Sequence, residues 1–196
     1  MDEMTLDRLI VENIADIDAT SRRAREIGEA IEKEIASRAR EWATANDYEA
    51  SQDDDENFWL SSPSWKTKGD EDSHDFWFEW YNRSSGVTDA VEDEYLITSL
   101  CGAGIDSVGF RLEQQPHAKR QWKKFVQSLS GALGGTRFVI DDAPSIWLPV
   151  VVDRVALAKA VEDDQYDVAL QPLIDALEQI KTHFALLDGL LSKVGD

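Results

Sequence analysis

The side chains best suited to chemistry lie in a short polar segment near position 70. Asp70, Asp72 and His74 alternate along the chain, and carboxylate and imidazole groups are common ligands of divalent metal ions. A metal ion held there could activate water, which is the chemistry of a metal-dependent hydrolase or nuclease. A solvent-exposed turn explains the same three residues without a metal. We take the turn as the main interpretation and the metal site as the alternative.

The common catalytic motifs are absent from the sequence. There is no glycine-rich phosphate loop, no Gly-x-Ser-x-Gly elbow and no zinc-binding pattern. Metal-dependent nucleases of the restriction-endonuclease type need an acidic residue two positions before a lysine, and none of the nine lysines has one. The single cysteine, Cys101, excludes an internal disulfide and has no recognisable histidine partner. We therefore expect no cofactor, and a non-enzymatic protein is favoured over an enzyme.

Aromatic and acidic side chains suggest a protein-binding surface instead. The segment from Asp75 to Tyr81 alternates like a β-strand and carries aromatic residues on both faces. Large aromatic residues dominate interface energetics, although they are also ordinary core residues. An acidic run over 53–56 is either a solvated linker or a contact for a basic partner. The predicted partner-binding residues are Trp59, Trp77, Trp80, Tyr81, Asp53, Asp54 and Asp55.

The net charge limits the kinds of partner. Twenty basic and 39 acidic residues give a formal charge of −19, which repels nucleic acid and anionic membranes and favours basic proteins. The same charge also serves solubility. The N-terminus is acidic, unlike a secretory signal, and no apolar run approaches the roughly 18 residues that span a bilayer. We expect a soluble, cytoplasmic protein with no direct nucleic-acid binding and no membrane partner.

Heptad patterns at both ends of the chain predict the elements that frame these residues. Apolar or small residues recur in steps of four and three from Ile10 to Trp42, and again from Tyr166 to Val194. Such seams pack one helix on another. We therefore expect a long helix over 6–45 that pairs antiparallel with C-terminal helices over 153–194. If the seams pair between subunits instead, through Leu177 and Phe184, the protein is a homodimer.

The region over 57–152 is rich in short alternating segments, and one further helix is predicted over 116–133. The spacing predicts a mainly antiparallel sheet of about five or six strands. Strands are expected at 58–60, 75–81, 95–100, 107–113, 138–140 and 146–152. The predicted fold class is α+β, with residues 1–196 forming a single domain in which the terminal helices pack on the sheet.

These features favour an acidic, non-enzymatic protein-interaction module of the adaptor, inhibitor or immunity type. Its partner is expected to be a basic protein that meets the acidic and aromatic surface. The first alternative is a metal-dependent hydrolase-like or nuclease-like domain, active or inactive. The second is a homodimeric structural protein.

Overall fold

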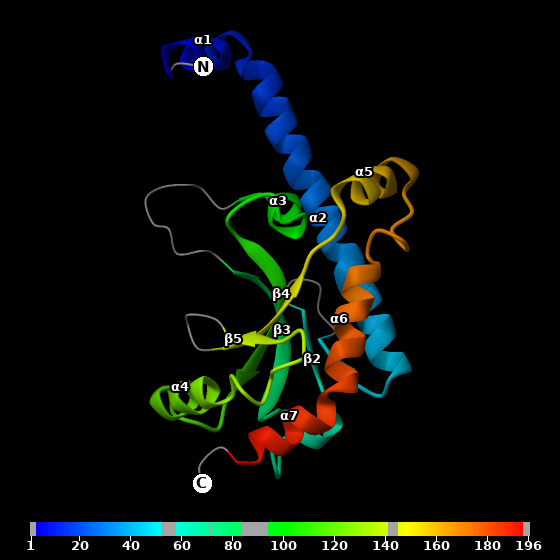
Figure 1. Cartoon of the computed structure of the whole chain (residues 1–196). Helices are drawn as coiled ribbons and strands as arrows, with labels where there is room; N and C mark the ends of the chain where they lie inside the picture. The colour runs from blue at the N-terminus through cyan, green and yellow to red at the C-terminus, as the bar shows by residue number, and fades with distance from the viewer. Residues whose placement is uncertain (1–2, 52–57, 71, 84–93, 141–144, 194–196) are drawn as a thin grey trace.

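Six antiparallel strands form one sheet at the centre of the molecule, in the order β1-β2-β3-β4-β6-β5 (Figure 1). The computed structural model describes residues 3–51, 58–70, 72–83, 94–140 and 145–193, with side chains from Thr5 onward. The strands are β1 (Glu49–Ala50), β2 (Trp59–Ser61), β3 (Phe76–Arg83), β4 (Ser107–Gln114), β5 (Val139–Ile140) and β6 (Ile146–Val150). The predicted α+β class and the antiparallel sheet are confirmed.

Helices precede, interrupt and follow the strands along the chain. They are α1 (Glu3–Glu12), α2 (Ile14–Ala45), the 3-10 turn η1 (Pro63–Trp65), α3 (Leu96–Leu100), α4 (Lys119–Ser128), α5 (Arg154–Asp163), α6 (Gln171–Thr182) and α7 (Phe184–Leu191). Helix α2 is about 48 Å long at 1.5 Å per residue. Within the described part of the chain, no helix has both the length and the apolar character needed to cross a membrane.

The two faces of the sheet differ in chemistry because successive side chains of a strand point to opposite sides. In β3, Phe78 and Trp80 are buried, whereas Trp77, Glu79 and Tyr81 are partly exposed. The pairing of neighbouring strands places residues of β2, β4 and β6 on the same two faces as these residues of β3. The core face also carries Leu60, Phe110, Leu112, Ile146 and Leu148, and the polar face also carries Trp59, Arg111, Glu113 and Trp147.

The terminal helices share one hydrophobic core with the core face. Helix α2 contributes Ile31 and Ile35, and α6 contributes Leu173, Leu177 and Ile180, all of them 0–1% exposed. Helices α2 and α6 lie side by side over much of α6 (Figure 1). The predicted seams therefore pack within one chain, as expected, from Gly28 onward in α2, whereas Ile10, Ile14 and Ile17 of the N-terminal seam are exposed. Because Leu177 is completely buried there, it is not available for a dimer contact.

The direction of this pairing differs from the antiparallel prediction. Arg38 binds Asp167, Trp42 binds Glu178 and Asn46 binds Lys181. The residue numbers rise together, so α2 and α6 run in the same direction. A heptad seam specifies which helix face packs but not the direction of the partner. The direction of α6 follows from the position of α5. Helix α5 lies beside the middle of α2, so α6, the next helix along the chain, begins near the middle of α2.

Both predicted long helices are interrupted by a local break. The N-terminal helix breaks at Asn13, whose side-chain amide donates to the Leu9 carbonyl at 2.7 Å. The C-terminal seam breaks at His183, between α6 and α7. A polar side chain that hydrogen-bonds the preceding turn competes with the helical backbone pattern. The apolar periodicity continues across each break, so the heptad pattern alone does not reveal it.

The helix predicted over 116–133 is shorter, and begins at Lys119. The Gln114 side chain accepts the His117 backbone N–H at 2.7 Å and donates to the His117 carbonyl at 3.0 Å. These two bonds hold the segment around Pro116 as a turn, so the helix starts after it. Beyond Ser128 the backbone continues as hydrogen-bonded turns.

The strand predicted over 95–100 is wrong, because this segment forms α3. Gly102 has a left-handed φ of 59°, and its N–H donates to the Ser99 carbonyl. The next N–H, from Ala103, donates to the Thr98 carbonyl. This pair of bonds is the Schellman motif that ends a helix at a glycine. Helix and strand are hard to distinguish for so short an apolar run.

Candidate functional site

A pocket on the polar face brings together aromatic and acidic side chains. It has a volume of about 340 Å³ and is lined by Trp59, Asp72, Ser73, His74, Trp77, Glu79 and Gln115. Strands β2 and β3 supply the two tryptophans and Glu79. The turn that precedes β3 supplies Asp72, Ser73 and His74.

Strand register explains why these side chains converge. Trp59 of β2 lies directly opposite Glu79 of β3. Trp77 is two residues before Glu79, and therefore projects from the same face of the sheet. Cross-strand neighbours on one face are about 5 Å apart at their Cβ atoms, which is close enough to form one continuous wall. The pocket is thus a direct product of the β2–β3 pairing.

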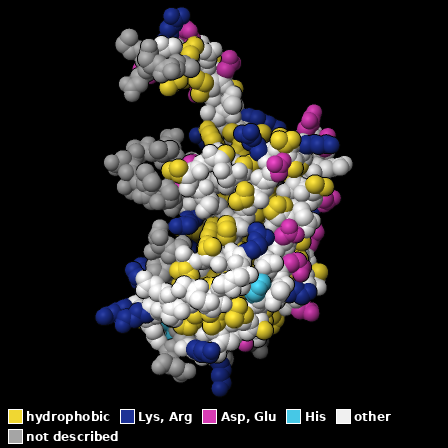
Figure 2. Space-filling view, in the orientation of Figure 1, with side chains coloured by type: hydrophobic (Ala, Val, Ile, Leu, Met, Phe, Trp, Pro, Cys, Tyr) yellow, Lys and Arg dark blue, Asp and Glu magenta, His cyan; other side chains and the backbone are white. Residues whose placement is uncertain are grey.

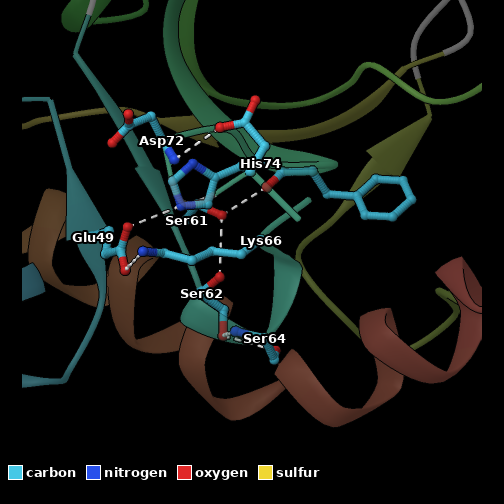
Figure 3. A network of polar contacts seen from close by, with 9 residues as sticks. Glu49, Ser61, Ser62, Ser64, Lys66, Asp72 and His74 are labelled. Carbon is cyan, nitrogen blue, oxygen red and sulfur yellow. Dashed lines mark hydrogen bonds and ion pairs between the residues drawn. The ribbon is translucent and has the colours of Figure 1, made fainter. Parts of the chain in front are cut away.

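A polar network holds the turn against the strands (Figure 3). His74 is only 7% exposed, and its Nε2 lies 3.1 Å from Oε2 of Glu49 in β1. The His74 ring also packs against Trp59, with 5.3 Å between ring centroids. The other carboxylate oxygen of Glu49 lies 3.0 Å from Nζ of Lys66. Buried polar groups need such partners, so this network orients the pocket wall.

The same network changes the acidity of Glu49. Its hydrogen bond from Lys66 lowers the pKa of the Glu49 carboxyl, and the electrostatic interactions with Lys66 and His74 act in the same direction. Partial desolvation opposes this effect and is outweighed. Glu49 therefore remains ionised to a lower pH than an ordinary glutamate.

The polar face continues beyond the pocket along β3 and β4. The Arg111 guanidinium lies 3.6 Å from the centre of the Tyr81 ring, and Arg111 also pairs with Glu113. Tyr81 meets Trp147 edge-on, with 6.3 Å between centroids. Trp147 is only 2% exposed, so this end of the face is closed and packed. The accessible aromatic surface is concentrated at Trp59 and Trp77.

The predicted partner-binding residues separate into three groups. Trp59 and Trp77 line the pocket, and Tyr81 lies on the same face. Trp80 lies in the core instead, 6% exposed and edge-to-face with Phe110, so it cannot contact a partner in the folded chain. The acidic residues Asp53, Asp54 and Asp55 lie outside the described residues.

The predicted metal ligands lie near one another, but they make other contacts. Asp72 and His74 line the pocket, while a carboxylate oxygen of Asp70 accepts the Asp72 backbone N–H at 3.1 Å. Among the described residues, no three His, Cys, Asp or Glu side chains are placed to hold a metal ion together. The metal site at Asp70, Asp72 and His74 stays a prediction.

Five contributors to the site were not predicted. They are Glu49, Lys66, Ser73, Glu79 and Gln115. The alternation of β3 could have revealed Glu79, since it lies between Trp77 and Tyr81 on the same face. No local signal marks Glu49, which lies 25 positions before His74 and meets it only after β1 pairs with β2.

A second, mostly apolar cavity of about 410 Å³ lies between α2, α3 and α5. Cys101 and Arg154 line it together with aliphatic side chains such as Ile27 and Leu157. Burial raises the pKa of the Cys101 thiol, and the nearby Arg154 opposes this effect. The thiol form is therefore favoured over the nucleophilic thiolate.

Comparison of the chain with protein-family models, with curated proteins and with solved structures finds no match in any of the three. The function must therefore be argued from the site itself.

Proposed function

We propose that this protein is a non-enzymatic interaction module that binds a basic segment of a partner protein on the polar face of its sheet. The observation that carries the proposal is the pocket in which Trp59 and Trp77 lie beside the carboxylates of Asp72 and Glu79. A lysine or arginine side chain fits this chemistry in two ways. Its cationic end is attracted both to the faces of tryptophan rings and to carboxylates.

The surrounding charge supports the same kind of partner. A chain with a formal charge of −19 attracts basic proteins over a longer range than any single contact. The long-range field raises the rate of encounter, whereas the tryptophan pocket contributes affinity and specificity. Binding of this type weakens as salt concentration rises.

The test compares partner capture by three purified chains. The first is the native sequence, the second carries Trp77→Ala with Asp72→Asn, and the third carries Val139→Ala. Val139 is the matched control, because it is an exposed apolar residue of β5 at the far edge of the same sheet face. Each chain is immobilised and exposed to an extract of the source cells at low and at high salt. Captured proteins are identified, purified and titrated calorimetrically against all three chains.

We expect a basic protein that binds the native and Val139→Ala chains equally and is released at high salt. The pocket variant is expected to bind it about 30-fold more weakly, which corresponds to a hot-spot loss of about 2 kcal/mol. A circular dichroism spectrum that matches the native one shows that the pocket variant remains folded. The proposal is wrong if the pocket variant and the control bind the captured protein with the same affinity.

A further inference from the structure

The cavity between α2, α3 and α5 has the size and the lining of a small-molecule site. Its volume of about 410 Å³ is within the range of about 300–1,000 Å³ that is typical of ligand pockets. Ile31 and Leu157, which are 0% and 4% exposed, form its floor, whereas Arg154 and Ala158 are exposed at its rim. Hydrophobic side chains reach the surface over α3 and α5 (Figure 2). The cavity is therefore open to a ligand from solvent.

The packing of the three helices leaves this space unfilled. Helix α3 packs directly on α2, whereas α5 lies less closely against α2 than α3 does. The rim residues Ala103 and Ala158 carry only methyl side chains, which are too short to fill the gap. The walls between rim and floor are aliphatic, with Ile27, Ile97 and Val161 half-buried. Such walls favour an apolar ligand over water.

The polar side chains of the cavity indicate the head group of that ligand. Among the described residues that line it, they are Arg154, Thr98 and Cys101, each able to donate a hydrogen bond, and no carboxylate is present. The Arg154 guanidinium pairs with no carboxylate within the described part of the chain. It is close enough to Cys101 to act electrostatically on the thiol. A cavity whose charged lining residue is an unpaired cation favours an anion.

A neighbouring carboxylate does not cancel this preference. Asp153 also acts on the Cys101 thiol, but it does not line the cavity. Its Oδ1 accepts the N–H groups of Val155 and Ala156, so its charge is partly compensated at the start of α5. Charges farther than about 8 Å from a bound anion are largely screened at physiological salt, whereas Arg154 would contact the anion directly.

The volume limits the length of the apolar part. An apolar cavity of about 150 Å³ holds a benzene ring, so about 410 Å³ has room for a chain of roughly eight carbons. We propose that this cavity binds a small aliphatic carboxylate, with its chain between α2, α3 and α5 and its head group on Arg154 and Thr98. This site is separate from the tryptophan pocket, so it adds a ligand to the proposed function and does not depend on it.

Cys101 reports occupancy directly, because it is the only cysteine of the chain, is partly exposed and lines the cavity. The rate at which it reacts with the neutral reagent N-ethylmaleimide is measured on the full chain at increasing octanoate concentration. We expect octanoate to slow the reaction to a plateau. Octan-1-ol has the same chain without the charge, so it should bind about tenfold more weakly, because a charge-assisted hydrogen bond is lost. The cation octylammonium should bind more weakly still.

Arg154→Met tests the contact with the head group. Lys159→Met is the matched control, since it removes a cation from another exposed residue of α5 that does not line the cavity. We expect Arg154→Met to bind octanoate about tenfold more weakly and octan-1-ol with native affinity. Lys159→Met should bind both compounds like the native chain. This pattern separates the charge of Arg154 from the packing of its side chain.

Ala158→Phe tests the cavity itself by filling it. Val155→Phe is the matched control, because Val155 is 73% exposed on the same helix and lies outside the cavity. A ligand that binds the folded chain raises its melting temperature, so octanoate should stabilise the native chain and Val155→Phe but not Ala158→Phe. The proposal is overturned if octanoate does not protect Cys101, if octan-1-ol protects it equally well, if Arg154→Met binds octanoate like Lys159→Met, or if Ala158→Phe is stabilised like its control.

Discussion

At the scale of single residues, the pocket depends on a histidine that faces inward. His74 is buried between Trp59 and the Glu49 carboxylate, and Lys66 binds the other oxygen of the same carboxylate. The sequence pattern of alternating Asp70, Asp72 and His74 was interpreted mainly as a solvent-exposed turn, with a metal site as the alternative. The imidazole instead joins the turn to the edge strand β1, so its clearest contribution is to position the pocket wall.

The Lys66–Glu49 pair predicts a pH-dependent contribution to stability. The Glu49 pKa is lowered in the folded state, so the pair stabilises the fold above the ordinary glutamate pKa. This contribution is lost as the pH falls through the lowered pKa. We expect Lys66→Met to reduce the free energy of unfolding by about 0.2–1 kcal/mol near neutral pH, a range that reflects solvent screening of an exposed pair.

The control for this prediction is Lys68→Met, which removes the same charge from an exposed neighbour. Urea unfolding of both variants and the native chain is measured from neutral pH to about pH 3, below the ordinary glutamate pKa. The deficit of Lys66→Met should shrink towards zero in acid. Parallel stability curves for the two variants would show that the Glu49 contact contributes nothing.

At the scale of elements, several helix ends depend on individual side chains. The Asn13 side chain binds a backbone carbonyl where the N-terminal helix breaks. The Gln114 side chain binds the His117 backbone N–H just before α4, so that α4 starts later than predicted. Asp153 starts α5, since one carboxylate oxygen accepts the N–H groups of Val155 and Ala156 at 3.0 and 2.8 Å. This cap fixes where α5 begins.

We expect Asp153→Ala to lower the free energy of unfolding by about 1 kcal/mol, the usual cost of losing an N-cap side chain. Asp153→Asn is the matched control, because its amide oxygen can accept the same two N–H groups. It should lose much less stability in thermal or urea unfolding. If both substitutions cost the same amount, the charge of Asp153 matters and the cap geometry does not.

At the scale of the whole molecule, the dominant feature is the charge of −19. Repulsion among so many carboxylates destabilises the compact state, and it is screened by salt. In the proposed function, the acidic charge attracts the basic partner, which the tryptophan pocket then binds.

Screening predicts that the melting temperature rises as sodium chloride is added from a low-salt buffer to about 0.3 M, where the Debye length falls below its value of about 8 Å at 0.15 M. Calorimetry or circular dichroism melts measure this directly. Capture of a basic partner should weaken over the same range, so stability and binding should respond to salt in opposite directions. A melting temperature that is constant or falls with salt would show that net repulsion does not limit stability.

Local periodicity in the sequence determined much of the architecture. Heptad spacing identified the helices at both ends and the face that α2 buries from Gly28 onward, and period-two alternation identified β3 and β4. Trp59, Trp77, Asp72 and His74 of the pocket were among the residues singled out from their types alone. These predictions succeed because the spacing of side chains on a helix or a strand is a property of the local backbone.

Tertiary structure alone decided the rest. Trp80 and Trp77 belong to the same strand, β3, but only Trp80 lies on its buried face. The parallel direction of α2 and α6 follows from the path of the whole chain, and a seam pattern is compatible with either direction. Glu49 meets His74 only through the pairing of β1 with β2. Such contacts depend on which distant surfaces pack together. That packing is decided by the free energy of the whole core rather than by any one segment.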